Sequence, residues 1–167
     1  MQHESGFDYT IYVAATPERI WRALTDPEDT RRYWRHREAG GKTFPSDWQP
    51  GSTWSLVHGD IGLVVSDPAM VIFESDPPRR LSYAWHTFTE EWAEAVGLDS
   101  AAAAAWRAEP RSRVRYDLEA TTQGVTRLTV VHDGFAPGSV VLPNIAQGWP
   151  AVFSSLKSMV ETGSPLP

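Results

Sequence analysis

The sequence predicts an α+β protein in which a curved antiparallel sheet of about six to seven strands wraps around one long C-terminal helix. Residues 143–163 repeat apolar side chains at steps of three and four, the spacing of a helix with one buried face. Upstream of this stretch, short alternating segments are separated by Gly, Pro and Asp turns, which is typical of an antiparallel meander. We expect residues 1–167 to form a single domain.

Composition narrows the classes of function. The net charge of −6 argues against nucleic acid or an anionic membrane as a partner. The chain has no cysteine, which excludes disulfides, thiol nucleophiles and thiolate metal sites. No apolar run approaches the roughly 20 residues that span a bilayer. The first ten residues lack the basic and apolar regions of a signal peptide, so we expect a cytoplasmic protein.

The N-terminal part reads as one strand followed by two short helices. Residues 7–14 alternate and are rich in aromatic and β-branched types, as strands are. Thr16-Pro17 and Asp26-Pro27 each combine an N-cap residue with a proline at the first helical position. Two short helices should therefore follow the first strand.

A meander and a long excursion make up the middle of the chain. Residues 35–51 are polar and rich in Gly and Pro, which predicts a loop. A helical excursion of one or two short helices is expected at about 87–111, and the long C-terminal helix at about 141–162. The remaining strands are expected at residues 52–58, 61–66, 70–75, 80–87, 113–120 and 126–132.

One helix lying across a strongly curved sheet leaves a space between the two, the helix-grip arrangement. Strand alternation predicts that Trp54, Leu56, Val71, Phe73, Tyr83, Trp85, Tyr116, Leu118, Val130 and His132 point into this space. An apolar cavity with a few polar anchors is the usual small-molecule site, and a filled core is the alternative. The candidate ligand-binding residues are Trp54, Phe73, Tyr83, Trp85, Tyr116, Leu118, His132, Gln147, Trp149 and Phe153.

His132 is the candidate for acid/base chemistry, because an unperturbed histidine titrates near neutral pH. No carboxylate is predicted on its face of the sheet. The five histidines form no HExxH or other close ligand pair, and no GxSxG or P-loop motif is present. We therefore expect no metal and no cofactor.

Two further clusters each allow two interpretations. Arg31, Arg32, Arg35 and Arg37 form either an anion or partner patch or the solvated end of a helix. The alanine run at 101–105, together with Trp92 and Trp106, forms either a lid over the mouth of the cavity or a packed helical insertion.

Four segments in this order resemble the SRPBCC (START-related) superfamily, and within it homologues of the C-terminal domain of the activator of the 90-kDa heat-shock-protein ATPase. They are VAATPERIWRALTDPEDTRRYW, ESDPPRRLSYAW, TRLTVVHDGF and QGWPAVFSSLKSMVETG. The resemblance implies the helix-grip fold. That fold hosts hydrolases, cyclases, lipid carriers, hormone receptors and chaperone partners, so it selects no single function.

The leading hypothesis is the binding of a small hydrophobic or aromatic ligand between the sheet and the C-terminal helix. One alternative is an enzyme of the polyketide cyclase, dehydratase or hydrolase type that uses the same cavity. The other is a protein-interaction module like the chaperone activator, with a chaperone as its partner. The exposed edge strands also allow a homodimer.

Overall fold

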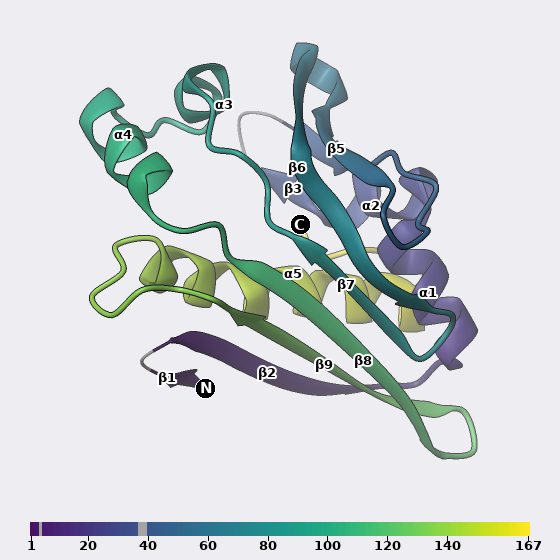
Figure 1. Ribbon diagram of the computed structural model, residues 1–167. Coiled ribbons are helices and arrows are strands. Elements are labelled where there is room, and N and C mark those ends of the chain that lie inside the picture. The colour runs from purple at the N-terminus through teal and green to yellow at the C-terminus, as the bar shows by residue number, and fades with distance from the viewer. Residues whose placement is uncertain (4, 37–39) are drawn as a thin grey trace.

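An antiparallel sheet and one long helix across its concave side form the frame of the protein (Figure 1). The computed structural model describes residues 1–3, 5–36 and 40–167. The described strands follow the order β1-β2-β9-β8-β7-β6-β5-β4-β3, and each strand runs antiparallel to its neighbours. The predicted α+β class, with its curved sheet and long C-terminal helix, is confirmed.

The two short helices after the first long strand begin where the capping residues predict. The Thr16 side chain accepts a hydrogen bond from the backbone N–H of Arg19 at 3.2 Å, and Asp26 accepts one from Glu28 at 2.9 Å. The elements of this part are β1 Gln2–His3, β2 Gly6–Val13, α1 Pro17–Thr25 and α2 Pro27–Tyr33.

The meander departs from the prediction in its first half. Residues 35–51 contain two short strands, because the polar segment around Lys42 pairs with β5 at the edge of the sheet. The predicted strands 61–66 and 70–75 form one strand that continues through Asp67-Pro68. The bounds are β3 Arg35–His36, β4 Gly40–Thr43, β5 Thr53–His58, the single-turn η1 Gly59–Ile61, β6 Leu63–Asp76, β7 Arg80–Ala84, β8 Arg113–Thr122 and β9 Val125–Asp133.

Because the register of β6 is irregular, the side chains of Val71 and Phe73 lie on the face opposite to the predicted one. Ser55 pairs with Ser66 whereas Thr53 pairs with Val71, so extra residues of β6 bulge between these points. Ile72 pairs with Tyr83 and shares its inward face, and it is only 2% exposed. Phe73 is 52% exposed on the other face. The predicted inward direction of Val71 and Phe73 is therefore wrong, because a shift of one residue turns a strand over.

The excursion between β7 and β8, for which one or two short helices were predicted, contains two. Side chains of Thr89 and Asp99 cap them by accepting hydrogen bonds from backbone N–H groups at 3.1 and 3.0 Å. The helices are α3 Glu90–Ala95 and α4 Ser100–Ala108.

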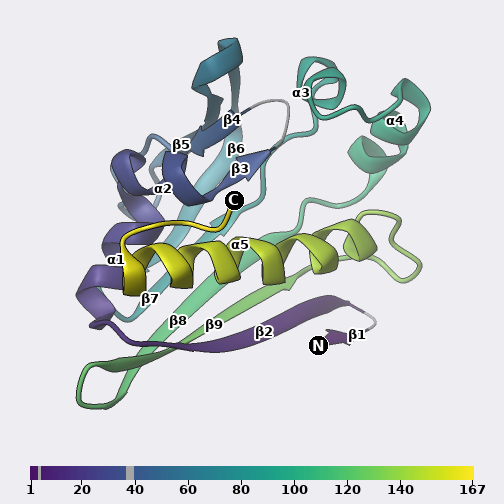
Figure 2. The same cartoon turned by 180° about the vertical axis from the view of Figure 1, so that it is seen from behind.

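The long helix α5, Leu142–Thr162, ends at Gly163, whose φ of 86° is the left-handed conformation that glycine tolerates. Figure 2 shows α5 crossing the concave face of the sheet, with α1 near its C-terminal end and α4 near its N-terminal end. No helix in the described part of the chain has the length and apolar character needed to cross a bilayer.

Candidate functional site

A cleft of about 440 Å³ lies among the first half of α5, the α3–α4 excursion and one end of the sheet. Its volume falls within the range of roughly 300–1,000 Å³ that small-molecule pockets occupy. We call it the aromatic cleft. Its principal lining residues are Trp34, Arg35, Lys42, Trp85, His86, Phe88, Trp92, Leu98, Trp106, Ile145, Gly148, Trp149 and Val152.

Rings of the excursion pack on one another and form one wall of this cleft. The ring centroids of His86 and Trp92 lie 4.9 Å apart, those of Phe88 and Trp92 5.3 Å, and those of Phe88 and Trp106 5.2 Å. Such tilted and edge-on contacts are the favourable arrangements for aromatic pairs. The excursion therefore presents a preformed aromatic surface to α5.

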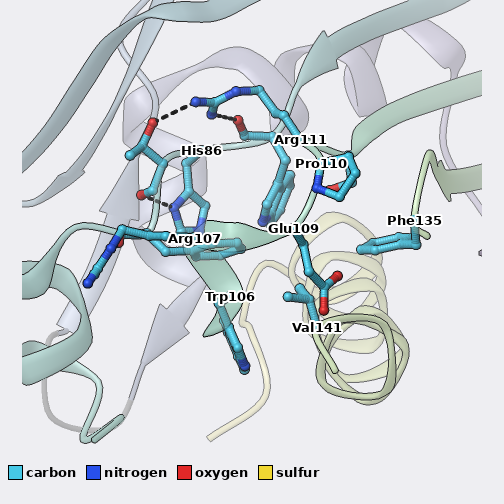
Figure 3. Close-up of a pocket in the computed structure, with 12 residues that line it drawn as sticks. His86, Trp106, Arg107, Glu109, Pro110, Arg111, Phe135 and Val141 are labelled. Carbon is cyan, nitrogen blue, oxygen red and sulfur yellow. Dashed lines mark hydrogen bonds between the residues drawn. The ribbon is translucent and has the colours of Figure 1, made fainter. Parts of the chain in front are cut away.

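Two charged side chains, Glu109 and Arg111, connect the C-terminal end of the excursion to the rest of the protein by hydrogen bonds. The carboxylate of Glu109 accepts hydrogen bonds from the Ser139 hydroxyl at 2.5 Å and the Val140 N–H at 2.7 Å. The Arg111 guanidinium donates to the Trp85 carbonyl at 2.7 Å and to the Thr87 hydroxyl at 2.9 Å. Figure 3 shows Glu109 and Arg111 beside a second cavity of about 160 Å³, which shares Trp85, His86, Phe88 and Trp106 with the aromatic cleft.

Most of the predicted ligand-binding residues fill the interior beneath the cleft. The hydroxyls of Tyr83 and Tyr116 hydrogen-bond to each other at 2.9 Å, and the indole N–H of Trp54 donates to the Ala84 carbonyl at 3.0 Å. The buried members are Trp54, Tyr83, Tyr116, Leu118, His132, Trp149 and Phe153. Their satisfied polar groups fit the filled-core interpretation that the sequence left open.

The three other predicted residues, Trp85, Gln147 and Phe73, divide between cleft and surface. Trp85 lines the aromatic cleft, and the buried Trp149 also contributes to its lining. Gln147 is exposed on α5 and lies outside the lining, and Phe73 lies on the opposite face of the sheet. Helical spacing separates Gln147 from Trp149, since positions two apart point in nearly opposite directions.

His132 is held as a neutral, fully hydrogen-bonded side chain. The indole N–H of Trp149 donates to its Nδ1 at 3.1 Å, so the proton resides on Nε2, which lies 2.8 Å from the Ser112 hydroxyl. Burial, and to a smaller extent the nearby His86, lowers the pKa of His132 to about 3. Both nitrogens are occupied, so this geometry supports a packing role for His132 and leaves no free nitrogen for catalysis.

His86 is the imidazole that reaches the cleft. Its Nδ1 lies 2.9 Å from the Thr87 carbonyl, which makes Nδ1 the donor and leaves Nε2 as an acceptor. Burial is the main cause that lowers the pKa of His86 to about 3, and the positive charges of Lys42 and Arg111 add to it. His86 is therefore neutral at physiological pH.

Two indole donors of the cleft residues lack partners. The Nε1 atoms of Trp85 and Trp92 are buried and make no hydrogen bond within the described part of the chain. Buried donors are nearly always paired in folded proteins. These two N–H groups therefore differ from the hydrogen-bonded indole of Trp54 and hydroxyls of Tyr83 and Tyr116 in the interior.

The structure shows where the arginine cluster and the tryptophans of the excursion lie, each of which the sequence allowed to be interpreted in two ways. Trp92 and Trp106 both line the aromatic cleft and also pack on Phe88, so the lid and the packed-insertion interpretations both fit their positions. Arg31 pairs with Glu28 at 2.6 Å and Arg32 donates to the Gly163 carbonyl at 2.6 Å, whereas Arg35 lines the cleft. Arg37, also assigned to the basic patch, lies outside the described residues.

Sequence reasoning missed Trp34, Lys42, His86 and Phe88 as cleft residues. Lys42 fell in a segment predicted as a loop, so no alternation indicated its direction. His86 and Phe88 follow the end of β7, where strand parity no longer applies. Among the described residues, no group of three or more His, Cys, Asp or Glu side chains is arranged to hold a metal ion.

Residues 14–161 match the family model described as "Activator of Hsp90 ATPase homolog 1-like protein", and the chain therefore belongs to that family, within the START-related class. No curated protein matches the chain.

Solved structures with the same fold come from several bacteria. Protein MLL2253 from Mesorhizobium loti is 22% identical, with a TM-score of 0.64 over 92% of this chain and 96% of that chain. The Aha1 dimer from Colwellia psychrerythraea is 17% identical, with a TM-score of 0.63 over 95% and 97%. DynU16, from the dynemicin biosynthetic locus, is 19% identical, with a TM-score of 0.67 over 98% of this chain and 49% of that chain. These likenesses establish the fold.

Proposed function

We propose that the protein binds a small apolar or aromatic molecule in the aromatic cleft. The observation that carries this proposal is a ligand-sized space beside a filled core, walled by rings of Trp34, Trp85, Phe88, Trp92, Trp106 and Trp149. Aromatic walls bury a large apolar area against a planar ligand. Each fully buried apolar group the size of a leucine or phenylalanine side chain contributes roughly 1.5–3 kcal/mol of transfer free energy.

Polar atoms in the same wall suggest what such a ligand also carries. Nε2 of His86 is an acceptor, whereas the indole N–H groups of Trp85 and Trp92 are donors that protein atoms enclose. A hydroxyl on the ligand would donate to Nε2 of His86, and the two indoles would reach a ligand only if their rings turned. An apolar body with one or two hydrogen-bonding atoms therefore suits this cleft better than a pure hydrocarbon.

The composition of the cleft favours binding over acid/base turnover. Its lining residues, among those the structure describes, include no carboxylate. His86, with a pKa of about 3, is a weak base at neutral pH. An enzyme of the cyclase or hydrolase type is therefore the second candidate, after ligand binding.

Filling the cleft tests the proposal. Phenylnaphthylamine, a neutral dye that fluoresces in apolar surroundings, should bind the wild-type protein and lose at least about tenfold in affinity in Gly148→Leu. Gly148 lines the cleft, and a Cβ there meets nothing within 4 Å, so the backbone tolerates the change. Leucine also raises helix propensity by up to about 1 kcal/mol, so lost binding would not reflect unfolding.

Gln147→Leu is the control, since it places the same leucine side chain one residue away and outside the cleft. Equal dye affinity in all three proteins, or no binding to the wild type, contradicts the proposal. Native mass spectrometry of freshly purified protein, compared with denaturing conditions, would give the mass of any ligand that copurifies.

A homodimer is a separate proposal, supported by the family relative from Colwellia psychrerythraea described as a dimer. We expect sedimentation to give twice the monomer mass of 18.6 kDa at micromolar concentration. A monomer mass at the highest attainable concentration would contradict it.

A further inference from the structure

Two cationic side chains lie at the β3–β4 end of the aromatic cleft. Lys42 of β4 is half-buried there, and Arg35 of β3 is exposed beside the opening. Neither side chain forms an ion pair with a carboxylate among the described residues, whereas Lys157 pairs with Glu161 and Arg111 with Asp67 at 3.4 Å. The cleft therefore combines aromatic walls with uncompensated positive charge.

Burial makes the Lys42 charge costly. Loss of solvent lowers the pKa of the Lys42 amine to about 8, so the group still carries most of its charge at neutral pH. The described parts of the neighbouring elements supply no counterion. His58 of β5 lies across from Lys42 in the sheet, His86 of the cleft wall is neutral, and the Asp60 carboxylate on η1 forms no ion pair with Lys42. A partly desolvated ammonium of this kind gains most from an anion.

We propose that the ligand of the aromatic cleft is an amphipathic acid, whose carboxylate or comparable anionic group pairs with Lys42 while its apolar body lies against Trp92 and Trp106. This inference rests on the proposed binding function and specifies the chemical class of the ligand. Arg35, at the opening, adds a second positive charge that attracts the same group.

A neutral ligand would leave the charge uncompensated. A carbonyl oxygen accepts a hydrogen bond from the amine but does not replace the hydration that the ammonium has lost. An anion contributes a charge-assisted hydrogen bond, which is about twice as strong as a neutral one. Among residues 1–3, 5–36 and 40–167, no carboxylate forms an ion pair with Lys42, which points to an anionic partner that arrives with the ligand.

Two fluorescent probes with a common aromatic body separate these possibilities. Anilinonaphthalene sulfonate carries an anionic group that phenylnaphthylamine lacks. Lys42→Met keeps the length of the side chain and removes the charge. We expect this variant to bind anilinonaphthalene sulfonate about tenfold more weakly and to bind phenylnaphthylamine within about twofold of the wild type. Lys157→Met, at the only other lysine of the chain, should change neither affinity.

The possible results of the two-probe experiment lead to different conclusions. An equal loss for both probes would assign Lys42 to the shape of the cleft and overturn the acid proposal while the binding function stands. Unchanged affinity for the sulfonate would overturn it as well. Failure of both probes to bind the wild type contradicts the proposed function itself, and this inference falls with it.

A measurement on the wild-type side chain keeps the test independent of folding. The chain contains only two lysines, so methylation with isotope-labelled formaldehyde gives few amine signals to follow by NMR. The pKa of the Lys42 amine should rise when the sulfonate saturates the protein and stay constant with phenylnaphthylamine. A constant pKa with both probes would contradict the ion pair.

Discussion

The two halves of α5 meet the rest of the protein in different ways. In the closed half, Phe153, Leu156 and Met159 are at most 1% exposed and pack directly on the sheet. In the open half, Ile145 and Val152 are only partly buried and face the aromatic cleft. The same helix, which runs along the sheet in Figure 2, therefore packs in the core at one end and forms one wall of the aromatic cleft at the other.

The difference comes from what lies opposite each half. Large side chains of the sheet interdigitate with the closed half and fill the space between helix and strands. Opposite the open half lies the α3–α4 excursion, whose helix α4 contributes Trp106 to the lining of the cleft. The large rings of the excursion pack on one another. The cavity therefore lies where this segment, and not the sheet, faces the helix.

The largest expected effect is a difference in the free energy of unfolding between a substitution in the closed half and one in the open half. Phe153→Ala removes a fully buried ring from the closed half and should lower the free energy of unfolding by about 3–5 kcal/mol. Val152→Ala, the adjacent residue in the open half, should cost about 1 kcal/mol, since its side chain is only partly buried. Urea unfolding of both variants measures the difference. Equal losses would remove the distinction between the halves.

Acid should lower the free energy of unfolding, because each of the two regions contains a buried histidine. The pKa values of His132 in the filled interior and of His86 at the cleft wall are lowered to about 3. Each pKa lies below the usual value near 6.5, so below that pH the unfolded chain binds more protons than the folded one. Stability is therefore full above about pH 6.5 and falls as the pH decreases toward 3. Between pH 7 and pH 5.5 the two histidines together should cost roughly 2.5 kcal/mol.

Urea unfolding at these two pH values checks this prediction. His86→Gln should remove about half of the pH dependence, because one of the two titrating groups is gone. His132→Gln should remove the other half and also lower stability at pH 7, since it disturbs the hydrogen bond from Trp149. Equal stability of the wild type at both pH values would contradict the buried, neutral state of both rings.

The smallest expected effect concerns binding alone. Trp106→Ala removes a half-buried ring from the wall of the open half and should weaken phenylnaphthylamine about tenfold, as expected for the loss of one ring contact. Its effect on unfolding should be smaller than that of Phe153→Ala. Trp21→Ala on α1, where the ring is also half-buried but outside the cleft, is the control and should leave dye affinity unchanged. Equal affinity in both variants would show that the dye binds elsewhere.

Regular elements could be predicted from the sequence, and irregular ones could not. The β8–β9 hairpin alternates without interruption along its central part, so its inward residues Tyr116 and His132 were predicted correctly. Phe73 was not, because the bulges in β6 depend on how three strands pair. The caps of α1 and α2 are local chemistry and needed no tertiary information.

The site was harder to predict than the fold. Trp92 and Trp106 were conspicuous in an excursion with no other evident role, and both reach the cleft. Lys42 had no such signal, since its place follows from the pairing of β4 with β5 at the sheet edge. Alternation indicates that a side chain points inward. It does not tell whether the space it enters is filled, as for Tyr83, or open, as for Trp85.

Eight tryptophan indoles provide the most direct measurement of the central claim, that ligand binds in the open half of the helix-grip space and not in its filled half. Each indole N–H gives its own NMR signal. On titration with phenylnaphthylamine, we predict that the signals of Trp85, Trp92 and Trp106 shift, while Trp54 in the filled interior stays in place. Shifts of Trp54 without the cleft signals, or no shift in any indole at saturating dye, would contradict the account.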